Sequence, residues 1–178
     1  MGKYLYGEWL KPIYHYIITI KKNEITFDIV LPIIIAFISS ILYFMNDFVL
    51  LALIKLRDLL PSSLSILIGF TIMCLTILVT GNSKSIDIIK EQICDKRVIG
   101  KNKITIYRWL LILFAYTLLI EIFTLILVFL SAFIIPLVKD IYIGVILLWL
   151  ETYLLCHILF IMIRAMTNLY LLFRCEDK

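Results

Sequence analysis

Charged residues, proline and glycine are all scarce in this sequence. Asp, Glu, Lys and Arg make up 17% of the 178 residues, whereas apolar residues make up 63%. Globular chains have about 25% charged and 45–50% apolar residues. With 4 prolines and 6 glycines, the chain has little material for long linkers. The composition therefore predicts an integral membrane protein, with too little polar sequence for an independent soluble domain.

The common signatures of catalytic and metal sites are also missing. The sequence has no P-loop, no H-E-x-x-H and no G-x-S-x-G, and its four cysteines lie far apart without a C-x-x-C pair. His157 has no partner for nucleophilic catalysis that the sequence identifies. We therefore expect no enzyme, no metal site and no cofactor. No small-residue cleavage site follows the first apolar run, so we expect no cleavable signal.

Four apolar runs have the length of membrane spans, at about residues 29–45, 62–80, 109–138 and 141–163. The predicted fold class is all-α, a single polytopic domain of four transmembrane helices. Pro61 is expected to end a short amphipathic connector before the second span.

The second connector, residues 81–108, is basic. Ile86, Ile89 and Ile93 keep helical spacing, so we expect the second span to continue into the aqueous phase as an amphipathic helix. A turn is expected at residues 100–102. The last span is expected to continue as a helix into a tail at 164–178.

An amphipathic helix is predicted at residues 9–20, with Pro12 in its first turn. Its apolar side carries Trp9, Ile13, Tyr16, Ile17 and Ile20. Its polar side carries Lys11, His15, Thr19 and Lys22. Lysines together with Trp and Tyr favour a helix that lies in the headgroup layer, and packing on a neighbouring subunit is the alternative.

The positive charges predict the orientation of the chain. If the termini and residues 81–108 share one side, the opposite side keeps only Lys55, Arg57 and Lys139 of the 17 Lys and Arg residues, which is 14 against 3. Positive residues are retained in the cytoplasm. We therefore predict a bacterial inner-membrane protein with both termini in the cytoplasm.

Two carboxylates interrupt the last two spans. Glu121 lies roughly 18 Å along the third span and Glu151 roughly 19 Å from the cytoplasmic end of the fourth, so a shared depth is predicted. A charge at the bilayer centre costs about 2.5–3.5 kcal/mol on insertion scales and marks a functional site by default. Two neighbouring carboxylates in apolar surroundings would share a proton, and in an oligomer they could form rings.

Polar residues recur on one face of the second and of the third span. On the third span the face contains Thr117, Glu121, Thr124 and Ser131. On the second span it contains Ser62, Ser65, Gly69, Thr76, Thr80 and Ser83. Such faces can line a pore, or they can pack closely against another helix, as the small-xxx-small pair Ser65–Gly69 would.

A third group of polar and charged residues lies near the predicted cytoplasmic ends of the spans. His157, Arg164 and Asn168 share one face of the fourth span and are candidates for gating, although Arg164 could simply extend its charge to the membrane surface. The basic connector offers Lys96, Arg97, Lys101 and Lys103 as contacts for anionic lipid or a partner protein. It lacks room for a nucleic-acid-binding fold.

The layout resembles the small four-span membrane proteins of bacterial anti-phage systems. The segments at 61–80 (PSSLSILIGFTIMCLTILVT) and 164–174 (RAMTNLYLLFR) carry the resemblance. The Hailong membrane effector is the nearest match in layout, and the Kiwa membrane component is second. The resemblance implies a homo-oligomer, a tetramer in the first instance, that acts as an ion-conducting pore. It also implies a cytoplasmic partner or signalling ligand that holds the pore shut until an infected cell is to be depolarised.

Three functions therefore compete. A homo-oligomeric gated pore, with carboxylate rings that favour cations, is the leading hypothesis. The alternative is a non-conducting membrane anchor or sensor that docks a cytoplasmic partner through its basic face. A proton-coupled transporter ranks third, because no broken helix or inverted repeat is visible.

Overall fold

Four helices of the described chain are long and apolar enough to cross a membrane. The computed structural model describes residues 8–82, 84–100, 102–134 and 141–174. The four helical segments run Lys22–Met45, Val49–Thr80, Ile106–Ile134 and Ile141–Tyr170. The predicted all-α, four-span class is confirmed, with a helix preceding the first span.

The first span begins seven residues earlier than predicted. Three segments follow one another without a break: α2 (Lys22–Ile25), a π-helical turn η2 (Thr26–Val30) and α3 (Leu31–Met45). The charged residues Glu24 and Asp28 therefore belong to the span, although hydropathy places them outside it.

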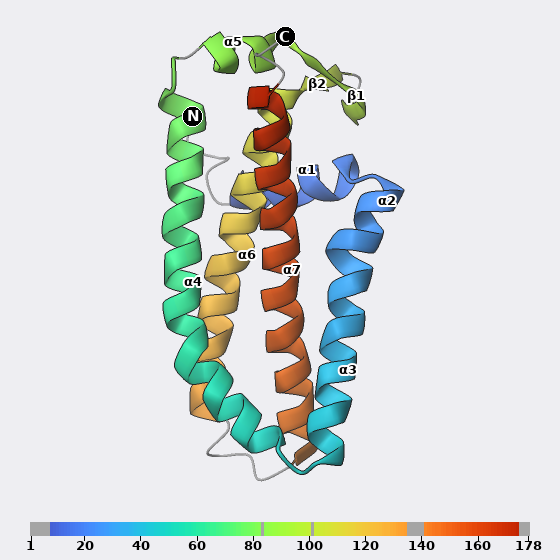
Figure 1. Cartoon of the computed structure of the whole chain (residues 1–178), viewed down its shortest axis with the longest axis vertical. Helices are drawn as coiled ribbons and strands as arrows, with labels where there is room; N and C mark the ends of the chain where they lie inside the picture. The colour runs from blue at the N-terminus through green and yellow to red at the C-terminus, as the bar shows by residue number, and fades with distance from the viewer. Residues whose placement is uncertain (1–7, 83, 101, 135–140, 175–178) are drawn as a thin grey trace.

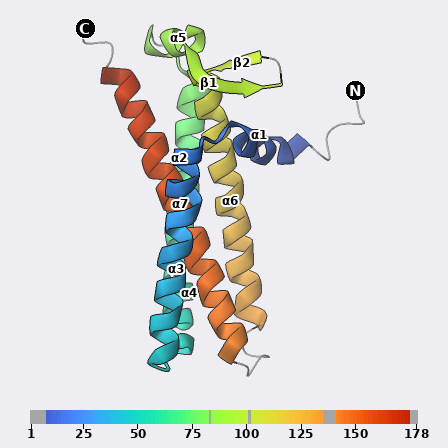
Figure 2. The same ribbon diagram turned by 90° about the vertical axis from the view of Figure 1, so that its right-hand side faces the viewer.

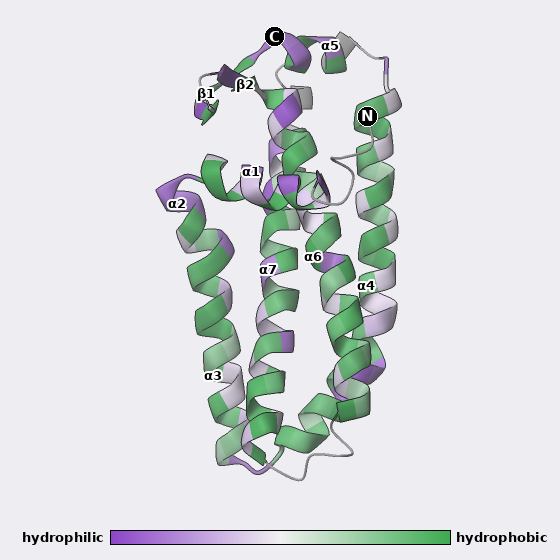
Figure 3. Cartoon of the chain, turned by 180° about the vertical axis from the view of Figure 1, so that it is seen from behind, coloured by the Kyte–Doolittle hydropathy of each residue, from purple (hydrophilic) through white to green (hydrophobic). Residues whose placement is uncertain are grey.

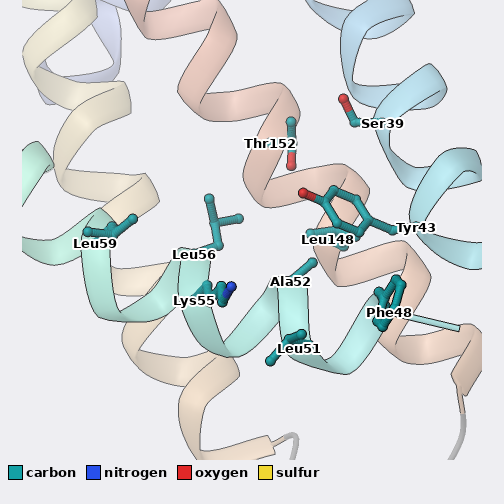
Figure 4. Close-up of a pocket in the computed structure, with 10 residues that line it drawn as sticks. All are labelled: Ser39, Tyr43, Phe48, Leu51, Ala52, Lys55, Leu56, Leu59, Leu148 and Thr152. Carbon is teal, nitrogen blue, oxygen red and sulfur yellow. The ribbon is translucent and has the colours of Figure 1, made fainter. Parts of the chain in front are cut away.

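The second span is a single bent helix, α4 (Val49–Thr80), and the prediction of a separate connector ended by Pro61 is wrong. Figures 1 and 4 show the first third of α4 crossing the end of the bundle before the helix turns along the bundle axis. Pro61 lies inside the helix and lacks the N–H that would bond the carbonyl of Arg57, which is a common cause of a kink. Arg57 consequently lies in the same helix as the second span.

An amphipathic helix follows the second span, as predicted, but it is separate from α4, and the predicted continuous extension of α4 is wrong. The chain is extended at Gly81, then forms a short helix α5 (Lys84–Glu91) and an antiparallel hairpin of β1 (Ile93–Ile99) and β2 (Asn102–Thr105). A Cβ at Gly81 would lie 2.5 Å from the Ile77 carbonyl oxygen, so the sharp exit from α4 depends on glycine. Of the turn predicted at residues 100–102, Gly100 has a positive φ of +64°, β2 begins at Asn102, and residue 101 lies outside the described chain.

The last two spans are α6 (Ile106–Ile134) and α7 (Ile141–Arg174). The third span was predicted to reach residue 138, and residues 135–140 lie outside the described chain. Helix α7 continues well past residue 163, as predicted, while residues 175–178 of the tail lie outside the described chain.

The four spans form an elongated bundle in which α6 and α7 are central (Figure 1). Helix α4 packs against α6, and α3 packs against α7. The 3₁₀ turn η1 (Glu8–Leu10) leads into α1 (Lys11–Thr19), which lies across the bundle axis. Figure 2 shows α5 and the hairpin covering the same end of the bundle.

The bundle is apolar on its outside and partly polar within. Outward-facing side chains on the four spans include Phe37, Ile66, Phe123 and Ile146, all more than half exposed. Figure 3 shows the spans as mostly hydrophobic, with hydrophilic segments gathered around α1, α2, α5 and the hairpin. The buried polar and charged residues of the described chain are Thr19, Asp28, Ser40, Thr71, Arg97, Thr117, Glu121, Thr124, Ser131, Glu151 and His157. Because an apolar exterior suits hydrocarbon, the buried polar groups are where function is expected.

Helix α1 is docked on its own chain, against α6 and β1. Tyr16 and Thr19 are buried, although the predicted polar side includes Thr19. The predicted amphipathic division is therefore shifted. The apolar residues that stay exposed are Trp9, Leu10, Tyr14, Ile17 and Ile18. A helix that crosses the bundle axis and exposes this set fits the headgroup layer.

Candidate functional site

Asp28 is the centre of a buried charged cluster at the level of α1. Its side chain is fully buried, and its Oδ2 accepts a hydrogen bond from the Tyr16 hydroxyl at 2.6 Å. The guanidinium of Arg164 lies 2.5 Å from the same oxygen. Helices α1, α7 and the first span thus meet at one carboxylate.

The backbone around Asp28 explains how His157 joins the cluster. In an α-helix the carbonyl of Asp28 would bond the N–H four residues later, but that residue is Pro32, which has none. The Nδ1 atom of His157 lies 2.5 Å from this carbonyl oxygen. Because a carbonyl oxygen only accepts, Nδ1 carries the proton, and the Nε2 of a neutral ring accepts from the Tyr116 hydroxyl at 2.8 Å. The site lies in a π-helical turn, a rare feature that is frequent at functional positions.

Two arginines from distant parts of the sequence bind Glu24. Arg164 lies 2.9 Å from Glu24 Oε2, and Arg97 of β1 forms an ion pair and hydrogen bonds with both carboxylate oxygens. Arg97 also donates to the carbonyl of Thr19 at 2.7 Å. The hairpin is thereby tied to α1 and to the start of the first span.

Aromatic rings enclose these charges. The Arg97 guanidinium lies 3.6 Å from the ring centroid of Trp109, and that of Arg164 lies 5.4 Å from it. Tyr16 stacks on Tyr116 at 3.9 Å between centroids. Cations over aromatic faces gain more when water is excluded.

The cluster is electrically balanced. Glu24 and Asp28 supply two negative charges, and Arg97 and Arg164 supply two positive charges, which sum to zero. Burial, followed by the hydrogen bond to Asp28, raises the pKa of the Tyr16 phenol, so Tyr16 remains a neutral donor. Buried charges that are paired and hydrogen-bonded can persist in an interior, whereas an isolated one cannot.

Of the predicted gating residues, His157 and Arg164 are in this cluster. Arg164 is 11% exposed at its side chain and forms two ion pairs, so the expectation that it only reaches for the membrane surface is wrong. Asn168 is half-buried one turn further along α7.

Glu121 lies deeper in the bundle and is bonded to α4. Its Oε1 accepts a hydrogen bond from the Thr71 hydroxyl at 3.0 Å. Thr71 is fully buried, and its hydroxyl also lies 3.6 Å from the sulfur of Met162. Glu121 Oε2 has no hydrogen-bond partner in the described chain.

Glu151 has different partners near the bend of α4. Ser131 donates to its Oε1 at 2.5 Å, and the Arg57 guanidinium lies 3.9 Å away. Ser131 lies ten residues beyond Glu121 on α6, or roughly 15 Å along the helix. The two carboxylates therefore do not share a depth within the chain, and the predicted proton-sharing pair is wrong for a single subunit.

The predicted polar face of the third span is a buried face. Thr117, Glu121, Thr124 and Ser131 are all at most 2% exposed. The hydroxyls of Thr117 and Thr124 bond carbonyls of their own helix at 2.8 and 2.7 Å. This face packs inside the chain, so it does not line an open pore within one subunit.

The predicted polar face of the second span points outward. Ser65, Gly69, Thr76 and Thr80 are exposed, and so is Ser62. The hydroxyls of Ser65, Thr76 and Thr80 bond carbonyls of their own helix at 2.7–2.9 Å. Ser83 lies outside the described residues. The exposed residues Ser62, Ser65, Gly69, Thr76 and Thr80, which we call the outer face of α4, are not covered by other parts of the described chain.

The proposed contacts of the basic connector differ in accessibility. Arg97 is 5% exposed and held in the cluster, so it is not a surface contact for a partner or lipid, and that prediction is wrong. Lys103 is exposed on β2. Lys101 and the side chain of Lys96 lie outside what the structure describes.

Sequence reasoning missed most of the cluster. From the sequence, Asp28 is only the residue that precedes the first span, and Tyr16 belongs to an apolar face. One usable signal is present. Pro32 has no N–H to bond the carbonyl four positions earlier, which belongs to the acidic residue Asp28 at the start of a span. The partners of that carbonyl come from distant segments and leave no local pattern.

The described residues contain no group of three or more His, Cys, Asp or Glu side chains that could hold a metal ion. Cys74, Cys94 and Cys156 are free thiols. No protein-family model, curated protein or solved structure matches the chain.

Proposed function

We propose that this chain is one subunit of a homo-oligomeric membrane pore, with a tetramer as the first expectation. One observation carries the proposal: the small and hydroxyl-bearing side of a membrane span, the outer face of α4, lies on the outside of the subunit. A Cβ added at Gly69 would meet no atom within 4 Å, so a neighbouring helix could approach closely there. In a ring of subunits these faces would meet around a common axis.

The charged cluster is the proposed gate. Helix α4 ends at Thr80, and the chain continues through α5 into β1, where Arg97 binds Glu24. The amide of Ile106 donates to the Gln92 carbonyl at 3.0 Å, which ties the start of α6 to the same connection. Breaking the ion pairs of the cluster would release α1 and α5 from their packing on the bundle. The end of α4 at Thr80, which is joined to α5, could then move. The resemblance to anti-phage proteins adds the expectation that opening depolarises the bacterial inner membrane.

Cysteine accessibility tests the pore. In a background with the native cysteines replaced, Thr76→Cys and Ser65→Cys would be exposed to a charged, water-soluble thiol reagent while ion flux into vesicles is followed. Phe123→Cys is the matched control, because Phe123 is exposed on α6 but lies off the outer face of α4. We expect block at Thr76 and Ser65 and no block at Phe123. Equal insensitivity at all three positions, or no flux from the unmodified protein, would contradict the proposal.

A non-conducting anchor is the second candidate, and the cap of α5 and the hairpin favours it. Lys103 is exposed on the cap, and Lys90 is 42% exposed although its ammonium lies 3.2 Å from Asp87, so the cap offers positive charge at its surface. Replacing both lysines with Glu should release a cytoplasmic partner and leave any conductance unchanged. Loss of partner capture without any measurable flux in the unmodified protein would favour this candidate.

A further inference from the structure

A groove opens between α3 and the bent first third of α4. It has a volume of about 480 Å³, within the roughly 300–1,000 Å³ of ligand pockets. Figure 4 shows Leu148 and Thr152 of α7 forming its floor, while Tyr43 of α3 and Ala52 of α4 come from its walls. All three helices are candidate spans, so lipid would surround a groove on their surface.

The polar groups in the groove are few and converge from different helices. The side chains of Tyr43 and Thr152 point toward each other above Leu148 (Figure 4). Ser39 lies deeper along α3, and its hydroxyl is bonded to its own helix at 2.8 Å. An apolar groove with a few hydroxyls at one end suits an acyl chain joined to a polar glycerol group.

Lys55 supplies the charge at the mouth. Of the three cationic residues that the sequence places at this end, Arg57 faces Glu151 and Lys139 lies outside the described residues. Lys55 is exposed, lines the groove, and has no carboxylate within 4.0 Å in the described chain. A lysine near the membrane surface attracts anionic headgroups.

We propose that this groove is a binding site for an anionic phospholipid. The Lys55 ammonium contacts the phosphate, the hydroxyls of Tyr43 and Thr152 face the ester region, and one acyl chain lies over Leu148 between α3 and α4. Lipid binding at this site does not require ion conduction, so its test is independent of the test of the proposed pore.

The test is native mass spectrometry of the full chain released from micelles that contain equal amounts of phosphatidylglycerol and phosphatidylcholine with identical acyl chains. We expect the protein to retain phosphatidylglycerol preferentially, and Lys55→Gln to lower that preference about fivefold, the effect of one lysine near an anionic surface. Lys55→Arg should keep it. Lys103→Gln, on the hairpin, is the charge-matched control and should also keep it.

A second variant tests the groove itself. Ala52→Phe fills the space between α3 and α4 and should reduce retention of both lipids, while the preference set by Lys55 persists in what remains. The proposal is overturned if Lys55→Gln retains lipid like Lys103→Gln. It is also overturned if Ala52→Phe changes the oligomer mass and leaves the lipid count unchanged, because a second copy would then occupy the groove. If Ala52→Phe fails to fold, the comparison of Lys55→Gln with Lys55→Arg still decides.

Discussion

Replacing Arg164 with Gln should destabilise the bundle strongly. The guanidinium lies 2.5 Å from Asp28 and 2.9 Å from Glu24, and its side chain is only 11% exposed. Glutamine keeps much of the volume but removes the charge. The cluster would then hold two carboxylates against the single guanidinium of Arg97, a net charge of −1 in a buried site.

The expected magnitude follows from that imbalance. Removing one partner of a buried ion pair costs about 3–5 kcal/mol, because the remaining charge is left without compensation. A chain of this size loses about 2–4 °C of Tm per kcal/mol, so a drop of roughly 6–20 °C is expected. The assay is thermal unfolding in detergent followed by helical circular dichroism.

Two controls make this prediction decisive. Arg108→Gln removes an exposed arginine and should change Tm by much less. Adding Asp28→Asn to Arg164→Gln restores the charge balance of the cluster. The double variant should therefore lose less Tm than Asp28→Asn and Arg164→Gln lose in total when each is made alone. The assignment fails if Arg164→Gln unfolds at the same temperature as Arg108→Gln, or if the two losses simply add.

Three further predictions concern other parts of the fold. Thr71→Val removes the hydrogen bond to the buried carboxylate of α6 and should cost about 1–3 kcal/mol, whereas Thr76→Val on the outer face of α4 should be nearly neutral in detergent unfolding. Gly81→Ala should lower Tm, because its Cβ would meet the Ile77 carbonyl oxygen at 2.5 Å, while Gly69→Ala should leave the subunit intact. Burial, then nearby positive charge, lowers the pKa of His15 below 6.5, so the stability that neutral His15 contributes is present above pH 6.5 and is lost as pH falls through its folded pKa. His15→Gln should flatten this part of the curve of Tm against pH, and an unchanged curve would refute the assignment.

The number and class of the spans could be predicted from the sequence because they depend on local hydropathy and length. Their ends could not be predicted as well. Lys22, Glu24 and Asp28 lower the hydropathy at the start of the first span, so the predicted span begins at residue 29. The helix nevertheless begins earlier, because Arg97 and Arg164 from elsewhere in the chain pair with Glu24 and Asp28. Pro61 suggests the end of a helix, although a proline within a long apolar helix can bend it instead.

The depth of the two carboxylates shows a different limit. A sequence gives the position of a residue along its own helix, but the offset between two helices is set by packing. The predicted shared depth assumes that the third and fourth spans cross the membrane boundary at Trp109 and Arg164. In the structure Ser131, not Glu121, lies beside Glu151. The face shared by Glu121 and Ser131 was correctly identified, because helical periodicity is local.

This placement changes what a pore built from this chain should select. Glu121 and Glu151 are fully buried and hydrogen-bonded inside the subunit, and Arg57 lies 3.9 Å from Glu151, so neither carboxylate faces a common axis. A pore lined by the outer face of α4 would present hydroxyls, which carry no net charge and would lack the cation preference of a carboxylate ring. Glu121→Gln should therefore leave the cation-to-anion permeability ratio unchanged. Glu151→Gln should lower the stability of the fold, because it leaves the Arg57 guanidinium without its carboxylate partner. A collapse of cation selectivity in Glu121→Gln would instead place that carboxylate in the conduction path and refute the α4-lined pore.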